Sequence, residues 1–176
     1  VTGAYDFTII GNNNNTANLN QANTFTSLIA NADDRWHLRG KVAGSLGLGD
    51  VTINPRSGGR SASLYIDAAD AMADTAKLSL NGLGYGGIGE DRLVMNANDT
   101  VNELWIDGTQ APAGTYDVSQ TWIKTGSTGT LTVTTGAVVG APTIAPSDFV
   151  DDVFGGPIYE DFTEVNYTLT FSNDMD

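Results

Sequence analysis

The sequence predicts an all-β protein, and within that class we favour an antiparallel β-sandwich of short strands, similar to a jelly roll. Apolar and polar residues alternate with a period of two in several short segments, as in strands with one buried face. Glycine and asparagine turn signals separate these segments, whose apolar centres lie roughly 11 to 15 residues apart between residues 51 and 106. Strict alternation implies one solvated face, which antiparallel sheets allow. A short β-helix or solenoid is the alternative fold.

The N-terminal part is predicted to hold a strand and a flexible connection. Residues 1–10 contain the terminal strand, in which Tyr5, Phe7 and Ile9 share one apolar face. The Asn-rich stretch 11–23 is expected to be a linker or loop, because asparagine side chains bond to the local backbone and tolerate left-handed conformations. Residues 24–32 fit a short helix or a strand, and their pattern does not choose between the two.

Residues 24–140 are predicted to form the β-domain core. Strand patterns recur in it, for example in "ASLYIDA", where Leu64 and Ile66 share a face, and in "KLSLNG", which ends in an Asn-Gly turn signal. The Ala-rich "ADAMADTA" between them is expected to form one helical turn. Further strands are expected in "RLVMNAND", "VNELWIDG", "GTYDVSQTWIKTG" and "GTLTVTTGAVVG".

The stretch "VNELWIDGTQAPAGTYD", residues 101–117, combines a strand with a turn. Gly108 and Gly114 can supply positive φ values, and Pro112 fixes φ within the turn. Trp105 and Ile106 point to opposite faces of the strand, so one is expected in the core and the other at the surface. Turn chemistry alone explains these residues, so we interpret the stretch as scaffold rather than as a ligand-binding loop.

The C-terminal part, residues 141–176, begins with a break marked by two prolines. We predict an acidic loop there, followed by a strand that completes the domain. The apolar face of this strand consists of Val165, Tyr167, Leu169 and Phe171. We further predict that one terminal strand, 4–10 or 162–171, pairs with a neighbouring subunit, because an apolar strand face must dock on some sheet and main-chain hydrogen bonds strengthen such pairing. The alternative is that both strands complete the domain's own sheet.

Composition restricts the partners and the compartment. Eight Lys and Arg residues against 21 Asp and Glu give a formal net charge of −13. This field repels nucleic acid and anionic membranes. The absence of cysteine excludes disulfides and thiolate metal sites. The sequence has no run of 18 apolar residues, so we expect no membrane insertion. Val1 is consistent with the first residue after a removed signal peptide, and we expect an extracellular or cell-surface location.

No motif predicts catalysis, so we expect a protein that is not an enzyme. His37 is the only histidine, and no nucleophile signature accompanies it. The glycine-rich "GLGYGGIG" lacks the lysine and the helix of a phosphate-binding loop. We predict no obligatory cofactor. Calcium is a candidate ligand at Asp148, Asp151 and Asp152, where oxygen ligands cluster at short spacing, and a solvated acidic loop is the alternative. The N-x-S/T sequons lie at Asn14, Asn98 and Asn166.

Residues 61–133 resemble the C-terminal region of bacterial autotransporter-associated β-strand repeat proteins, which are large secreted surface proteins of Verrucomicrobia and Planctomycetes. The matching pattern is a strand with V-x-x-L-x-x-x-G, then a Q-x-P/A-G-T-Y turn, then G-x-G-x-L-x-V. It is occupied here by Val101, Leu104, Gly108, Gln110, Gly114, Thr115, Tyr116, Gly126, Gly129, Leu131 and Val133. The resemblance implies a surface-exported context and a scaffold role for the turn.

These observations predict a secreted structural subunit of a bacterial surface layer, extracellular matrix or filament, which assembles with copies of itself by β-strand addition. The alternative is a carbohydrate-binding or adhesive module of the cell surface that recognises surface glycans. In that alternative Trp36, Trp105 and Trp122 would provide a stacking platform. Aromatic residues at alternating strand positions are more often core residues, which places this alternative second.

Overall fold

The computed structural model describes residues 4–11, 15–32, 36–55, 63–82 and 93–137 of the 176-residue chain. All helix-or-strand structure in these residues is β-strand, which confirms the all-β prediction. The chain divides into a compact unit Val1–Val139 and a second unit Gly140–Asp176. The predicted acidic loop and terminal strand of residues 141–176 lie outside the described residues.

The described strands are short. In chain order they are β1 (Asp6–Gly11), β2 (Thr16–Leu19), β3 (Ser27–Ala32), β4 (His37–Gly40), β5 (Asp50–Pro55), β6 (Ser63–Ile66), β7 (Lys77–Leu80), β8 (Leu93–Met95), β9 (Asp99–Val101), β10 (Glu103–Ile106), β11 (Thr109–Gln110), β12 (Gly114–Tyr116) and β13 (Leu131–Val133).

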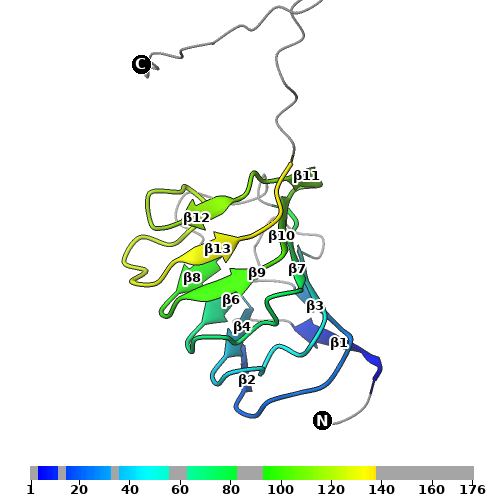
Figure 1. The fold of residues 1–176 in the computed structure, drawn as a ribbon. Helices are drawn as coiled ribbons and strands as arrows, with labels where there is room; N and C mark the ends of the chain where they lie inside the picture. Colours follow the sequence, from blue (N-terminus) through cyan, green and yellow to red (C-terminus); the bar gives the residue numbers. More distant parts are fainter. Residues whose placement is uncertain (1–3, 12–14, 33–35, 56–62, 83–92, 138–176) are drawn as a thin grey trace, which may run out of the picture. The chain divides into compact units, whose positions relative to one another are not determined.

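The chain winds in coils that stack on one another, and the strands of successive coils pair into three sheets (Figure 1). Sheet A has the order β1-β3-β5-β7-β10-β11, and all its pairs are parallel except β10 with β11. Sheet B has the order β2-β4-β6-β8 and is parallel throughout. Sheet C holds β9 and β13 in parallel, with β12 antiparallel at its edge. Up to β8, the chain therefore visits sheet A and sheet B in turn, and each pair of visits adds one coil.

The described sheets do not have the predicted antiparallel sandwich arrangement, because most of their strand pairs are parallel, as the alternative of a short β-helix or solenoid predicts. The alternating pattern was interpreted as the mark of an antiparallel sheet with one solvated face. A coil has the same property, because each of its strands turns one face to the core and the other to solvent. The short spacing between strands therefore separates successive sides of one coil, not hairpin partners.

The core consists of aliphatic residues stacked between coils. In sheet A, Leu28 lies beside Val51, Val51 beside Leu78 and Leu78 beside Leu104. Sheet B repeats this with Leu38, Leu64 and Leu93, and a bridge continues the row to Ile123. The side chains of these two rows are fully or almost fully buried. Burial of each such side chain contributes about 1.5–3 kcal/mol, so the rows hold neighbouring coils together.

The third side of the early coils is made of stacked turns instead of strands. The Asn23 amide donates to the Gly44 carbonyl at 2.9 Å, and the Leu46 amide donates to the Ala71 carbonyl at 2.9 Å. Buried Asn23 adds a side-chain bond from Nδ2 to the Ser45 carbonyl at 2.7 Å. Close packing continues on this side at the later coils, where a Cβ on Gly129 would collide with the backbone of Ala97.

Two local predictions of the sequence are corrected. The stretch 11–23, predicted as a linker or loop, contains β2, because Ala17 and Leu19 pack against the core and the main chain pairs with β4. The segment "ADAMADTA" forms turns rather than a helical turn, with Ala71 and Met72 buried. Residues 24–32, left open between helix and strand, contain β3.

Gly108 lies in a tight turn and adopts the positive φ that the sequence predicts for it. Trp105 lies opposite Gln110 and Ile106 opposite Thr109, so Asp107 and Gly108 form a two-residue hairpin loop. Their φ values are 49° and 80°, as a type I′ turn requires. Gly114 also has a positive φ, 158°. The stretch therefore ends a parallel sheet with a hairpin.

Candidate functional site

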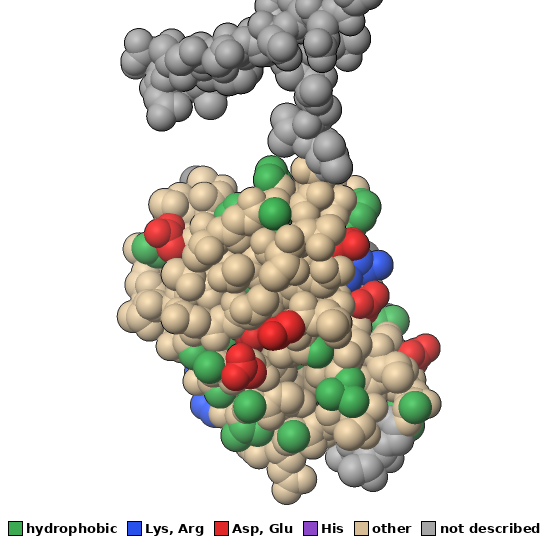
Figure 2. All heavy atoms as spheres, in the orientation of Figure 1, with side chains coloured by type: hydrophobic (Ala, Val, Ile, Leu, Met, Phe, Trp, Pro, Cys, Tyr) green, Lys and Arg blue, Asp and Glu red, His purple; other side chains and the backbone are tan. Residues whose placement is uncertain are grey.

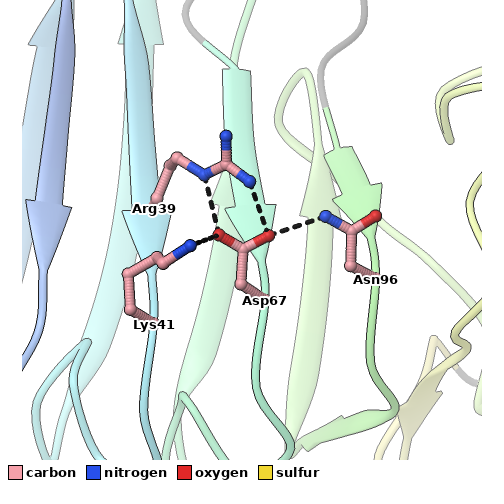
Figure 3. Close-up of polar contacts among 4 residues, drawn as sticks. All are labelled: Arg39, Lys41, Asp67 and Asn96. Atoms are coloured by element: carbon pink, nitrogen blue, oxygen red, sulfur yellow. Dashed lines mark hydrogen bonds and ion pairs between the residues drawn. The ribbon is translucent and has the colours of Figure 1, made fainter.

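The most extensive described group of charged side chains lies on the outer face of sheet B. Arg39 comes from β4, Lys41 and Asp67 directly follow β4 and β6, and Asn96 directly follows β8 (Figure 3). Inward residues alternate with outward ones along these strands, so buried Leu38 and Leu64 leave Arg39 and Tyr65 on the outer face. The parallel register then places the four polar residues on adjacent coils. We call them the Asp67 cluster.

The carboxylate of Asp67 is the centre of this cluster. Arg39 donates from Nε to Oδ2 at 2.7 Å and from its terminal nitrogen to Oδ1 at 2.9 Å. Lys41 Nζ lies 3.1 Å from Oδ2, and Asn96 Nδ2 donates to Oδ1 at 2.6 Å. The guanidinium carbon of Arg39 lies 4.5 Å from the centre of the Tyr65 ring, which adds a cation–π contact.

The donors determine the protonation of both charged partners. Hydrogen bonding to Arg39 lowers the pKa of Asp67 to about 2, against a smaller opposing effect of burial. The hydrogen bond to Asp67 raises the pKa of Arg39. The Asp67 side chain is 9% exposed, while Arg39 and Lys41 are 31% and 38% exposed. A carboxylate whose oxygens already contact four donor groups is a poor general base. Because these donors come from the coils on both sides of Asp67, the cluster acts as a brace across three coils.

A second carboxylate, Asp99, lies inside the coil stack. Its position on β9 points inward, where the next coil places Leu131, and the residue is 3% exposed. The Met72 amide donates to Oδ2 at 3.1 Å, and the Thr100 amide donates to Oδ1 at 2.9 Å. Burial raises the pKa of Asp99 to about 6, although these backbone bonds oppose the shift. Asp99 thereby caps the turn of the preceding coil.

An asparagine row crosses sheet A. Asn54 Nδ2 donates to Asn31 Oδ1 at 3.0 Å, and Asn81 Nδ2 donates to Asn54 Oδ1 at 2.7 Å. Asn31 and Asn54 lie near the ends of β3 and β5, and Asn81 directly follows β7, at one coil per step. The amides therefore satisfy one another along the stack.

The predicted assembly strand is the first strand of the stack. β1 pairs with β3 of its own chain, and Phe7 stacks on Phe25 with ring centres 5.4 Å apart. Phe7 and Ile9 pack partly against the core, while Tyr5 is 38% exposed. Within the described residues, β1 and β2 each have a neighbouring strand on one side only. The second predicted assembly strand, with Val165, Tyr167, Leu169 and Phe171, lies outside the described residues.

The remaining predicted residues do not converge on one place. Asn98 is exposed, and its Oδ1 accepts a hydrogen bond from the Thr130 amide at 3.0 Å. Asn14 and Asn166 lie outside the described residues, as do Asp148, Asp151 and Asp152. In the described ranges no three acidic or histidine side chains gather as a metal site would require. Calcium binding by the acidic loop stays a prediction. His37 lies half-buried on β4 with its ring edge-on to Tyr65, 5.2 Å between centres.

The three tryptophans occupy different positions. Trp36 is buried in the core, and half-buried Trp105 donates from Nε1 to Glu103 at 2.7 Å. Trp122 packs against Tyr116, with ring centres 5.4 Å apart. They therefore do not form one shared stacking platform. Among the described residues, no helix has the length and apolar character needed to cross a membrane.

Sequence reasoning missed the Asp67 cluster and Asp99. A signal for the cluster exists, because "LRGK", "LYID" and "LVMN" align when leucine is placed in register. The fourth position of each is Lys41, Asp67 or Asn96, which become neighbours only if the strands are parallel. No family model, no curated protein and no solved structure matches the chain.

Proposed function

We propose that this chain is a structural subunit of a bacterial surface layer, extracellular matrix or filament, which assembles through β-strand addition. The observation that carries the proposal is the open end of the coil stack. β1 and β2 end sheets A and B, and each has a neighbouring strand on one side only in the described residues. Such an edge is a template for another strand.

The build of the stack supports a scaffold role. Rows of aliphatic side chains, the asparagine row and the Asp67 cluster each link one coil to the next. A repetitive coil is held mainly by its neighbours, so it makes a stiff spacer. The surface-protein resemblance and the absence of cysteine favour an exported location.

The proposal is tested by the assembly state of the purified 176-residue chain. We expect the mass measured by light scattering to rise with concentration, and negative-stain microscopy to show assemblies larger than one chain. A chain that stays monomeric at high concentration, with and without calcium, would contradict assembly by strand addition.

A carbohydrate-binding or adhesive module is the second candidate, and one observation favours it. The outer face of sheet C carries uncharged amides and hydroxyls in neighbouring coils, where Thr132 lies beside Thr100 and Thr130 bonds to Asn98. Such groups suit sugar hydroxyls. Binding of a monomeric chain to a glycan array, lost on Thr100→Val with Thr132→Val, would favour this candidate over the first.

A further inference from the structure

The two ends of the coil stack differ in the strands that they offer to another molecule. At the N-terminal end, the six residues of β1 have no strand neighbour on one side within the part of the chain that the structure describes. At the other end, sheet A finishes with the two-residue β11 and sheet C with the three-residue β12, both antiparallel to their neighbours. Pro112 lies between these two short strands. Short edge strands and nearby proline are ordinary protections against strand pairing, so among the described residues the N-terminal end is the less protected of the two.

The N-terminal end is also nearly free of charge. Asp6 is the only charged residue in the first 32 positions of a chain whose net charge is −13. Two copies of such a chain repel each other at most approaches. An approach through residues 1–32 brings the fewest carboxylates together, and it therefore has the smallest electrostatic cost.

Exposed apolar side chains concentrate in the same coils. Ile10 is 67% exposed and Tyr5 38%, and in the adjoining turn Leu48 is 58% exposed and Val42 37%. Val118 is the one other large hydrophobic residue that is exposed in the described part of the chain. Figure 2 shows hydrophobic side chains dotted over the lower half of the visible face, where Figure 1 places β1 and β2.

We propose that two copies of this chain join edge to edge through β1 and form a closed two-fold dimer. The proposal rests on the strand addition of the proposed function, and it names the partner as a second copy. In this dimer, a two-fold axis perpendicular to sheet A relates the β1 strands of the two copies. The two strands are then antiparallel, and the inner faces of the two sheets join into one continuous face. The joint is isologous and therefore stops at two copies, so it accounts for one pairwise contact of the proposed assembly and not for growth into a layer or filament.

The period of the strand restricts the register of this joint. Phe7 and Ile9 face the core in each copy, while Asp6, Thr8 and Ile10 face outward. A shift by one residue would put the apolar residues of one copy on the outer face of the other. The allowed pairings therefore place Phe7 and Ile9 opposite inward-facing residues of the second copy. Pairing of Phe7 with Ile9 also centres Thr8 on the two-fold axis and keeps the two Asp6 carboxylates apart.

The dimer is tested by the mass of the chain and of two matched variants. Thr8 and Thr115 are both exposed threonines on edge strands, β1 and β12, at opposite ends of the stack. Lysine on an edge opposes strand pairing, and both substitutions change the net charge equally. By sedimentation equilibrium we expect twice the 18.5 kDa chain mass for the unchanged chain and for Thr115→Lys, and a single-chain mass for Thr8→Lys.

A second measurement keeps the proposal testable if Thr8→Lys does not fold. The chain has no cysteine, so Thr8→Cys and Thr115→Cys each accept one spin label. In an N-end to N-end dimer, the labels at position 8 give a short distance and those at position 115 a long one. A short distance between the two labels at position 115 overturns the proposal. So does the absence of any measurable label-to-label distance at both positions.

The outcomes separate this inference from the function on which it rests. If the unchanged chain forms polymers and Thr8→Lys prevents them, assembly by strand addition is supported and the closed two-fold dimer is overturned. Dimers unaffected by Thr8→Lys, with long label distances at position 8, would overturn the β1 joint alone. A monomer at every concentration would overturn both proposals.

Discussion

The carboxylate of Asp99 accepts a hydrogen bond from the backbone amide of Met72, which lies 27 residues earlier in the chain, at 3.1 Å. Met72 belongs to the turn of the preceding coil, where Asp70 adopts a φ of 54°. A side chain of one coil thus caps the turn of another in a place that water barely reaches, since Asp99 is 3% exposed.

The burial of Asp99 predicts a gain in stability on mild acidification. Its folded-state pKa of about 6 exceeds the ordinary value of 3.8, so the folded chain binds this proton more tightly. Its contribution is fully present below the ordinary pKa and is lost as pH rises through about 6. A shift of this size corresponds to about 2–3 kcal/mol. Urea unfolding at pH values between about 4 and 7 would measure the slope.

The control for this prediction is Asp74→Asn, which removes an exposed carboxylate from the turn that follows Met72. We expect Asp99→Asn to flatten the pH dependence of the unfolding free energy and Asp74→Asn to leave it. Equal slopes in the two variants would assign the effect to the overall negative charge instead of to Asp99.

The Asp67 cluster predicts the opposite dependence at lower pH. The pKa of Asp67 is lowered to about 2 from 3.8, so its contribution is present above the ordinary pKa and is lost as pH falls towards 2. Arg39→Gln removes two of the four donors, and we expect the pKa of Asp67, followed by carboxyl carbon NMR, to rise towards its ordinary value. Lys41→Gln removes only one donor, and that donor is more exposed than Arg39. This variant should therefore raise the pKa of Asp67 less. An unchanged pKa in Arg39→Gln would contradict the geometry of the cluster.

The asparagine row predicts a cost for breaking its middle member. Asn54→Ala removes the donor to Asn31 and the acceptor of Asn81 together. Part-buried amides without partners cost about 1–3 kcal/mol each, and we expect a loss in that range by thermal or urea unfolding. Asn18→Ala, at an exposed position of β2, should change stability by less than about 0.5 kcal/mol. Similar losses in both variants would mean that the row adds nothing.

The tight stacking of turns predicts that Gly129 tolerates no side chain. A Cβ at this position would meet the Ala97 backbone, which cannot move without shifting β9. We expect Gly129→Ala to lower the melting temperature strongly. Gly108→Asn is the comparison, because its Cβ meets open space and asparagine tolerates the positive φ of the hairpin loop. A larger effect of Gly108→Asn would contradict the close contact between coils.

Much of the secondary structure was predictable because its signals are local. Leu64 and Ile66 were expected on one face of a strand, and both are fully buried in β6. Gly108 and Gly114 were expected to supply positive φ values, and both have them. β2 was missed, because its pattern is weak and its pairing with β4 overrides the local preference of asparagine for loops.

By itself, the sequence determined that the described chain is all β, where most of its strands lie and, in strands such as β6, which side chains face inward. The tertiary structure alone decided that the strands pair in parallel, and hence that Arg39 meets Asp67 and that Met72 meets Asp99. The physical reason is that a period of two records only the two faces of a strand. Main-chain hydrogen bonds carry no residue identity, so the partner of each strand depends on how the coils stack their inward side chains.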